Sequence, residues 1–238
     1  MNLKASIGYQ LRSSGKALAI FYGVIYAIIA VAAIVAVSTD GQLGVAGLET
    51  STAVFMGFLG VFTFSEDFRF LIQNGYSRKS MLRSFLCQFA VVSLLAAAID
   101  VLNSRLLLPL WGYRSTFTQL YGQSQLPGLI WQLLWGCSLY FAIATITYFM
   151  AALYQRLGRL QRLLFMLILP LAVLVLFPVL DFQLLGGTAT RWLLKVLSQA
   201  LGFAKGGLQM GLPVLFFLAI SAVFSVFSYL ATRRASVS

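Results

Sequence analysis

Long uncharged apolar runs, separated by short segments that carry the charges, make up most of the chain. A helix needs about 20 residues, at about 1.5 Å each, to cross the hydrocarbon core of a bilayer. We expect six transmembrane helices, at residues 17–37, 44–64, 85–104, 128–153, 163–180 and 211–232. The uncharged run of the second span covers only residues 50–64, so we expect its helix to begin near Gly44 and to carry Glu49 at its rim. Pro170 and Pro178 predict kinks in the fifth, because neighbouring helices can satisfy the freed carbonyls.

The composition agrees with this pattern. Hydrophobic residues make up 60% of the 238 residues and charged residues only 10%. Soluble domains average roughly 45–50% apolar and about 25% charged residues. We therefore predict an all-α integral membrane protein, with residues 1–238 forming a single transmembrane domain.

The basic residues indicate how the helices are oriented. Six spans place both termini on one side, and the segments on that side hold 12 of the 17 Lys and Arg residues. These are Lys4, Arg12, Lys16, Arg69, Arg78, Lys79, Arg83, Arg156, Arg159, Arg162, Arg233 and Arg234. The positive-inside rule then predicts a multi-pass protein of the cytoplasmic membrane with both termini in the cytoplasm. The net charge of +11 is explained by this orientation and by contact with anionic lipids, so no nucleic-acid partner is expected.

The segment before the first span, residues 1–16, is amphipathic. On a helix, Leu3, Ile7 and Leu11 fall within one narrow sector, and the basic side chains spread over the neighbouring face. Such a helix is expected to lie along the inner leaflet. It acts either as a topology anchor or as an elbow that transmits force to the first span.

A second amphipathic segment, residues 190–204, lies between the fifth and sixth spans. Its apolar residues recur at helical spacing from Trp192 to Leu201, with charged and polar residues opposite. The glycine pairs at 186–187 and 206–207 supply reversals that would let a short helix dip into the outer leaflet and return. An interfacial helix that only covers the bundle is the alternative.

The loop between the second and third spans, residues 65–84, is long for a cytoplasmic hairpin. Glu66 and Asp67 precede an apolar run, which favours a helix start with acids near the positive end of its dipole. Asn74–Gly75 is typical of a helix stop or a tight turn, and Ser77 is suited to cap the next helix. We expect a short cytoplasmic helix, a turn and a basic restart; an ordinary positive-inside loop is the alternative.

The order of these features resembles the membrane subunit of bacterial ABC exporters, the type-2 permease family with the type V exporter fold. In that family an elbow helix precedes six spans, a coupling helix after the second span docks on the ATPase, and a re-entrant element separates the fifth and sixth. The resemblance covers nearly the whole chain, and its sharpest match is an acidic residue and a helix followed by a glycine and a Ser-Arg-Lys group. It implies an ATPase-coupling interface at Glu66, Asp67, Phe68, Arg69, Leu71, Ile72, Gln73, Asn74, Gly75, Tyr76, Ser77, Arg78 and Lys79.

The resemblance also implies the source of energy and the partners. The chain contains no GxxxxGK[ST] phosphate-binding loop, since residues 75–80 have the wrong spacing and one glycine too few. We therefore expect no cofactor in this chain, with ATP and Mg²⁺ bound by a separate ATPase subunit. Two membrane subunits, identical or different, would pair with two ATPases.

By the same resemblance the protein would be the permease of an exporter that works by alternating access. Few charges lie in the spans, so a lipophilic or amphipathic cargo such as a peptide, lipid or drug is expected. Phe55, Phe58, Leu59 and Phe62 recur at helical spacing on the second span. They either line the cargo path or serve bundle packing and lipid contact.

Two other classes of function compete with a transporter. One is a membrane immunity or substrate-capturing protein that acts without ATP. The other is an intramembrane enzyme, which the absence of histidine and the scarcity of acids disfavour, so we expect neither catalytic residues nor a metal site. Asp100 is the one acid well within a span, and a rim ion pair with Arg105 or a water-exposed position is preferred over a proton relay.

Overall fold

A computed structural model describes residues 3–38, 47–106, 113, 115–122, 126–204 and 207–233. These residues are helical apart from loops and one antiparallel hairpin of two short strands, β1 (Phe203–Ala204) and β2 (Gly207–Leu208). Five helical stretches are long and apolar enough to cross a membrane: Ala5–Ala36, Leu48–Gln73, Arg78–Leu106, Gly128–Arg156 and Gly211–Arg233. They match the first, second, third, fourth and sixth expected spans, although residues 44–46 of the second lie outside the described residues. The helical, multi-pass character is confirmed, with five candidate spans where the sequence predicts six.

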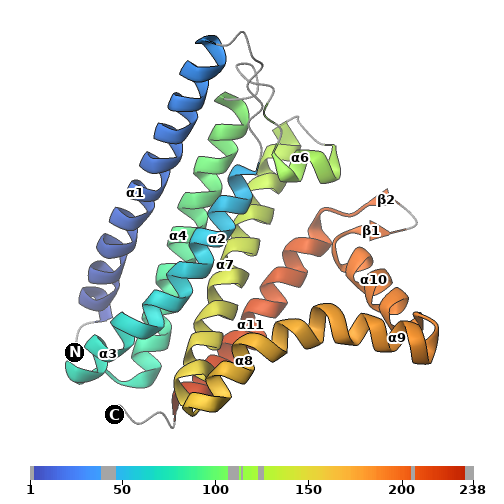
Figure 1. Cartoon of the computed structure of the whole chain (residues 1–238). Helices are drawn as coiled ribbons and strands as arrows, with labels where there is room; N and C mark the ends of the chain where they lie inside the picture. The colour runs from blue at the N-terminus through green and yellow to red at the C-terminus, as the bar shows by residue number, and fades with distance from the viewer. Residues whose placement is uncertain are drawn as a thin grey trace.

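The spans form one bundle around a central helix (Figure 1). Its members are α1 (Leu3–Ser38), α2 (Leu48–Phe62), α4 (Arg78–Leu106), α7 (Leu126–Arg156) and α11 (Gly211–Arg233). Helix α7 packs against α2, α4 and α11, and α1 packs against α4. Between α4 and α7 the chain also forms the short helix α6 (Thr116–Tyr121).

One end of the bundle, which we call the basic end, holds the start of α1, the turn before α4, the turn after α7 and the end of α11 (Figure 1). Both ends of the described chain therefore lie at this end of the bundle. Basic residues that the sequence assigns to the cytoplasmic side lie on these segments. Those with described side chains are Arg12, Lys16, Arg78, Lys79, Arg83, Arg156, Arg162 and Arg233.

The core forms where α2, α4 and α7 meet, and small residues set how closely they approach. Met56, Phe85 and Ala144 are completely buried there. At Gly60 of α2, a Cβ atom would overlap the Thr147 hydroxyl and the Ala144 carbonyl of α7. Only glycine therefore fits at this crossing, in agreement with the use of small residues where membrane helices touch.

Helix α1 is a single unbroken helix of 36 residues, about 54 Å long at about 1.5 Å per residue. It contains the described part of the expected elbow as well as the first span, so the elbow is not a separate helix in this structure. Between residues 5 and 22 its buried positions recur every four residues, at Ser6, Gln10, Ser14, Leu18 and Tyr22. The elbow segment therefore turns a small, polar stripe toward the bundle.

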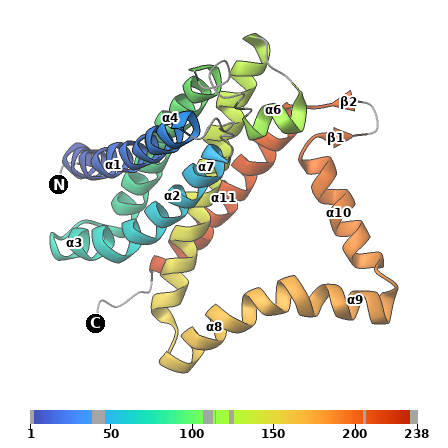
Figure 2. The same ribbon diagram turned by 45° about the horizontal axis from the view of Figure 1, so that its top comes forward.

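The fifth expected span, residues 163–180, is helical but leaves the bundle. Helix α8 (Arg159–Leu171), the π-helical turn η2 (Ala172–Leu176) and helix α9 (Phe177–Leu185) run continuously. The π turn lies between Pro170 and Pro178, which lack the N–H groups that a regular α-helix uses. Figure 2 shows this stretch running away from the bundle and α10 (Thr188–Ala200) returning toward the start of α11.

The reversal between α9 and α10 follows the glycine prediction. Gly186 and Gly187 both have positive φ angles, 58° and 78°. The Asp181 carboxylate accepts hydrogen bonds from the backbone N–H groups of Ala189 (3.0 Å) and Thr190 (2.7 Å), which satisfies donors at the start of α10.

The glycine crossing of α2 and α7 gives a direct test. We predict that Gly60→Ala lowers the free energy of unfolding by about 1–3 kcal/mol, because the added methyl group has no space. Gly57→Ala is the matched control: its Cβ would meet Ile143 and Thr147 at an ordinary 3.7 Å. The control should be neutral or stabilising by up to about 1 kcal/mol, since alanine favours helix. Denaturant unfolding in detergent, followed by circular dichroism, measures both, and equal stabilities would contradict the crossing.

Candidate functional site

The expected coupling segment is the continuation of the second span past the bundle. Helix α2 passes through the π-helical turn η1 (Thr63–Asp67) into α3 (Phe68–Gln73), so that one stretch of 26 residues runs from Leu48 to Gln73. Glu66 and Asp67 lie inside this π turn, and the expected helix start at these acids is wrong. We call residues 63–79 the hairpin.

The inner face of the hairpin is fixed in the core. Phe68 and Leu71 are almost fully buried, and the ring of Phe68 stacks on that of Phe64 with centroids 4.8 Å apart. Phe64 in turn meets Tyr148 of α7 edge to face. The hairpin is therefore continuous with the packing of the bundle.

The outer face of the hairpin is free of such packing. Of the predicted coupling residues, Glu66, Gln73, Asn74, Gly75, Ser77 and Lys79 are exposed, whereas Asp67, Ile72, Tyr76 and Arg78 are half-buried. Of Arg69 only the backbone is described. Phe70 is also exposed, and it stacks on Tyr9 of α1 with centroids 5.2 Å apart. The sequence prediction thus contains both surface residues and residues that hold the hairpin in place.

The turn of the hairpin is closed by backbone hydrogen bonds. Gly75 has a φ of 71°, and its N–H donates to the Ile72 carbonyl at 2.9 Å while the N–H of Tyr76 donates to Leu71 at 3.0 Å. This pair of bonds is the Schellman motif that ends a helix at glycine. The Ser77 hydroxyl then accepts the N–H of Ser80 (3.3 Å), capping α4. The predicted stop at Asn74–Gly75 and the predicted cap at Ser77 are both confirmed.

Arg78 connects the hairpin to the last helix. Its Nη1 donates to the carbonyl oxygen of Thr232 at 2.6 Å and also to that of Arg233. A cation at the end of α11 satisfies carbonyls that have no partner within the helix and lies favourably in the helix dipole. Arg78 therefore has a structural role. Its neighbour Lys79 is exposed, and no such contact is recorded for it among the described residues.

The four residues proposed for a cargo path do not share one environment. Leu59 is buried, and Phe55 stacks on Phe21 of α1 with centroids 4.7 Å apart. Phe58 and Phe62 are more than half exposed on the outside of α2. The structure does not bring these four side chains together around one cavity among the described pockets.

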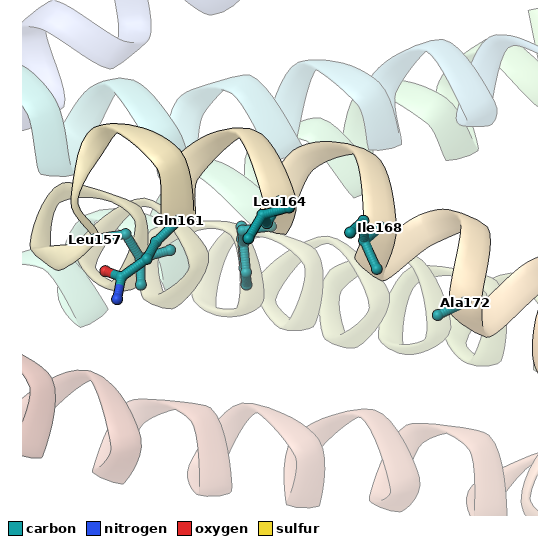
Figure 3. Close-up of a pocket in the computed structure, with 6 residues that line it drawn as sticks. Leu157, Gln161, Leu164, Ile168 and Ala172 are labelled. Atoms are coloured by element: carbon teal, nitrogen blue, oxygen red, sulfur yellow. The ribbon is translucent and has the colours of Figure 1, made fainter.

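An apolar groove occurs elsewhere, along helix α8 (Figure 3). It has a volume of about 430 Å³ and is open along its side. The groove is lined by Leu157, Gln161, Leu164, Phe165, Ile168 and Ala172. All six lie in α8, in the turn before it or in η2, so they supply one wall only.

A buried carboxylate is the main feature that the sequence interpretation missed. Asp100 of α4 is 4% exposed, and its Oδ1 accepts hydrogen bonds from Tyr22 (2.9 Å) and Thr52 (3.2 Å). Its Oδ2 accepts one from Tyr140. We call these three hydroxyls, which come from α1, α2 and α7, the hydroxyl cage. The expected ion pair with Arg105 or exposed position is therefore wrong, because Asp100 lies inside the bundle.

A second carboxylate lies beside the cage. Glu49, in the first turn of α2, is 6% exposed and accepts hydrogen bonds at Oε2 from Tyr113 and from Thr116 (3.3 Å). Tyr140 reaches both carboxylate residues, through Asp100 and through the Glu49 backbone carbonyl (3.5 Å). Across the part of the chain that the structure describes, no three His, Cys, Asp or Glu side chains are grouped to hold a metal ion.

A polar seam joins α1 to α4 nearer the basic end. The hydroxyls of Ser6 and Ser84 lie 3.0 Å apart, and Ser84 also donates to Gln10. Gln88 donates to Ser14 at 2.5 Å. The four-residue spacing of the Ser and Gln positions in residues 6–14 is the signal in the sequence that could have identified this seam.

Comparison with protein-family models, with curated proteins and with solved structures finds no match to this chain. We therefore infer function from the geometry above and from the order of features along the sequence.

Arg78 and Lys79 provide a matched test of the helix brace. We predict that Arg78→Gln lowers the free energy of unfolding by about 1–2 kcal/mol, because two carbonyls of α11 lose a charged donor. Lys79→Gln should change it by less than about 0.5 kcal/mol, as is usual at exposed positions. Hydrogen exchange read by mass spectrometry should show faster exchange in the last turn of α11 for the first variant only. Unchanged exchange in Arg78→Gln would exclude the brace.

Proposed function

We propose that this chain is the membrane permease subunit of an ATP-driven ABC exporter, in the cytoplasmic membrane, with the basic end in the cytoplasm. The orientation follows from the positive-inside rule applied to the basic end. The chain has no phosphate-binding loop of its own, so a separate ATPase subunit would supply the energy.

The hairpin is the observation that carries this proposal. It is a continuous helical extension of α2, it is closed by the Schellman turn at Gly75, and it is fixed to the core by Phe68 and Leu71. Its outer face is exposed at the basic end. A protein that pushed on Gln73 or Lys79 would therefore displace α2 and α4 together, because both helices begin or end in the hairpin.

The groove along α8 supports a lipophilic cargo and a second membrane subunit. Its lining is almost entirely apolar, which fits an apolar or amphipathic substrate. Since α8 supplies one wall only, a second copy or a related subunit would supply the other. Such a pair would alternate its opening as the two hairpins move.

The experiment measures the ATPase activity that co-purifies with the chain in mild detergent. We predict that Gln73→Glu combined with Lys79→Glu lowers this activity at least tenfold, because both residues lie on the exposed face of the hairpin. Lys195→Glu combined with Gln199→Glu is the control: it makes the same charge change on exposed positions of α10 and should leave the activity unchanged. Changes at Gly75 or Arg78 are avoided, because they would break the turn or the brace.

The melting temperatures of both double variants should equal that of the wild type. Equal ATPase activity in the two variants would contradict docking on the hairpin. Wild-type protein that carries no ATPase activity would contradict the exporter and favour a capturing or immunity protein that acts without ATP.

A further inference from the structure

A small cavity lies beside the two buried carboxylates, toward the end of the bundle opposite to the basic end. Its volume is about 10 Å³. It is lined by Glu49, Ala97, Asp100, Val101, Phe117, Gln132, Trp135, Gly136 and Tyr140. Asp100 stands six positions before the end of α4, and Glu49 stands in the first turn of α2, so the cavity is close to the rim of the bundle.

Three polar atoms of residues that line the cavity have no hydrogen-bond partner among the described residues: Oε1 of Glu49, Nε2 of Gln132 and Nε1 of Trp135. All three residues are at least nine-tenths buried, at 6%, 5% and 6% exposure. Buried polar atoms almost always have a partner, so these three point to a molecule bound between them.

The cavity volume and the three atoms together identify water as that molecule. A volume of about 10–15 Å³ holds one water. Water can donate to Glu49 and accept from both Gln132 and Trp135, which satisfies the acceptor and the two donors together. A metal cation fits poorly, because it would face the two N–H donors and would lack the six or more oxygen ligands that hard cations prefer.

Among the described residues, the ionisable groups recorded at the cavity or in contact with its two carboxylates are acids and phenols. Tyr22 on α1 and Tyr140 on α7 face Asp100, and Tyr113 faces Glu49. Each partner recorded for the two carboxylates in the described residues is neutral. A buried carboxylate without a charged partner costs free energy, and two neighbouring charges of the same sign add repulsion. Keeping one proton on the pair removes the repulsion and the burial cost of one of the two charges.

We propose that Glu49, Asp100 and one water in this cavity form a proton-binding site, in which the two carboxyl groups share one dissociable proton. Binding converts one carboxylate and one hydronium ion into a carboxylic acid and a water molecule. The proton is assigned to the pair, because both acidic residues line the same small cavity. This inference does not depend on the exporter proposal.

Infrared spectroscopy of the purified protein in lipid nanodiscs tests this site. The wild type should show the C=O stretch of a protonated carboxyl group at pH 7 and lose it on titration to higher pH. Glu49→Gln and Asp100→Asn should each abolish the band or shift its titration midpoint, whereas Glu66→Gln, an exposed acid in the hairpin, should not. Trp135→Phe should shift the frequency by removing one donor to the water, and Trp192→Phe, which is exposed, should not.

Three results would overturn the proposal. The first is the absence of a protonated-carboxyl band in the wild type at neutral pH, which requires no variant to fold. The second is a band that remains unchanged in both Glu49→Gln and Asp100→Asn. The third is stabilisation of the wild type by sodium chloride but not choline chloride, lost in Glu49→Gln, which would identify a metal cation instead.

Discussion

The bundle depends on satisfying hydrogen-bonding groups where water is scarce. Helix α1 has many apolar side chains exposed to the surroundings, and apolar contact alone distinguishes poorly between a neighbouring helix and lipid. Its attachment to α4 instead includes two polar layers. Near the basic end the layer is the seam of Ser6, Gln10 and Ser14, and toward the opposite end it is Tyr22 on Asp100.

This arrangement connects the two sites described above. The central helix α7 contacts α2, α4 and α11. Its Tyr140 donates to Asp100, and its Tyr148 packs on Phe64 of the hairpin. A displacement of the hairpin would therefore act on the same helices that enclose the carboxylates. The close crossing at Gly60 leaves no free space between α2 and α7, so we expect these two helices to move together.

Features set by local sequence could be predicted, whereas those set by contacts between distant helices could not. The runs of apolar residues located the five spans, and Asn74–Gly75 and Ser77 gave the turn and the cap, because these depend on neighbouring residues only. The environment of Asp100 depends on Tyr22 and Tyr140, which are 78 and 40 positions away. No periodicity in the sequence reports such a contact.

Two other differences have similar causes. Apolar length predicts that residues 163–180 can cross a membrane, but whether they pack in the bundle depends on partners that length does not specify. In residues 1–16 the basic and leucine positions predicted a helix on the membrane surface. The buried stripe at Ser6, Gln10 and Ser14 instead continues that segment into α1.

The central claim is that a separate motor protein binds the hairpin. Its most direct test is site-specific photocrosslinking in intact membranes, with benzoylphenylalanine placed at Gln73. The account predicts a crosslink to a cytoplasmic ATPase, which is absent when the same probe replaces Lys195. Crosslinks to lipid alone, or no crosslink from a correctly inserted protein, would contradict it.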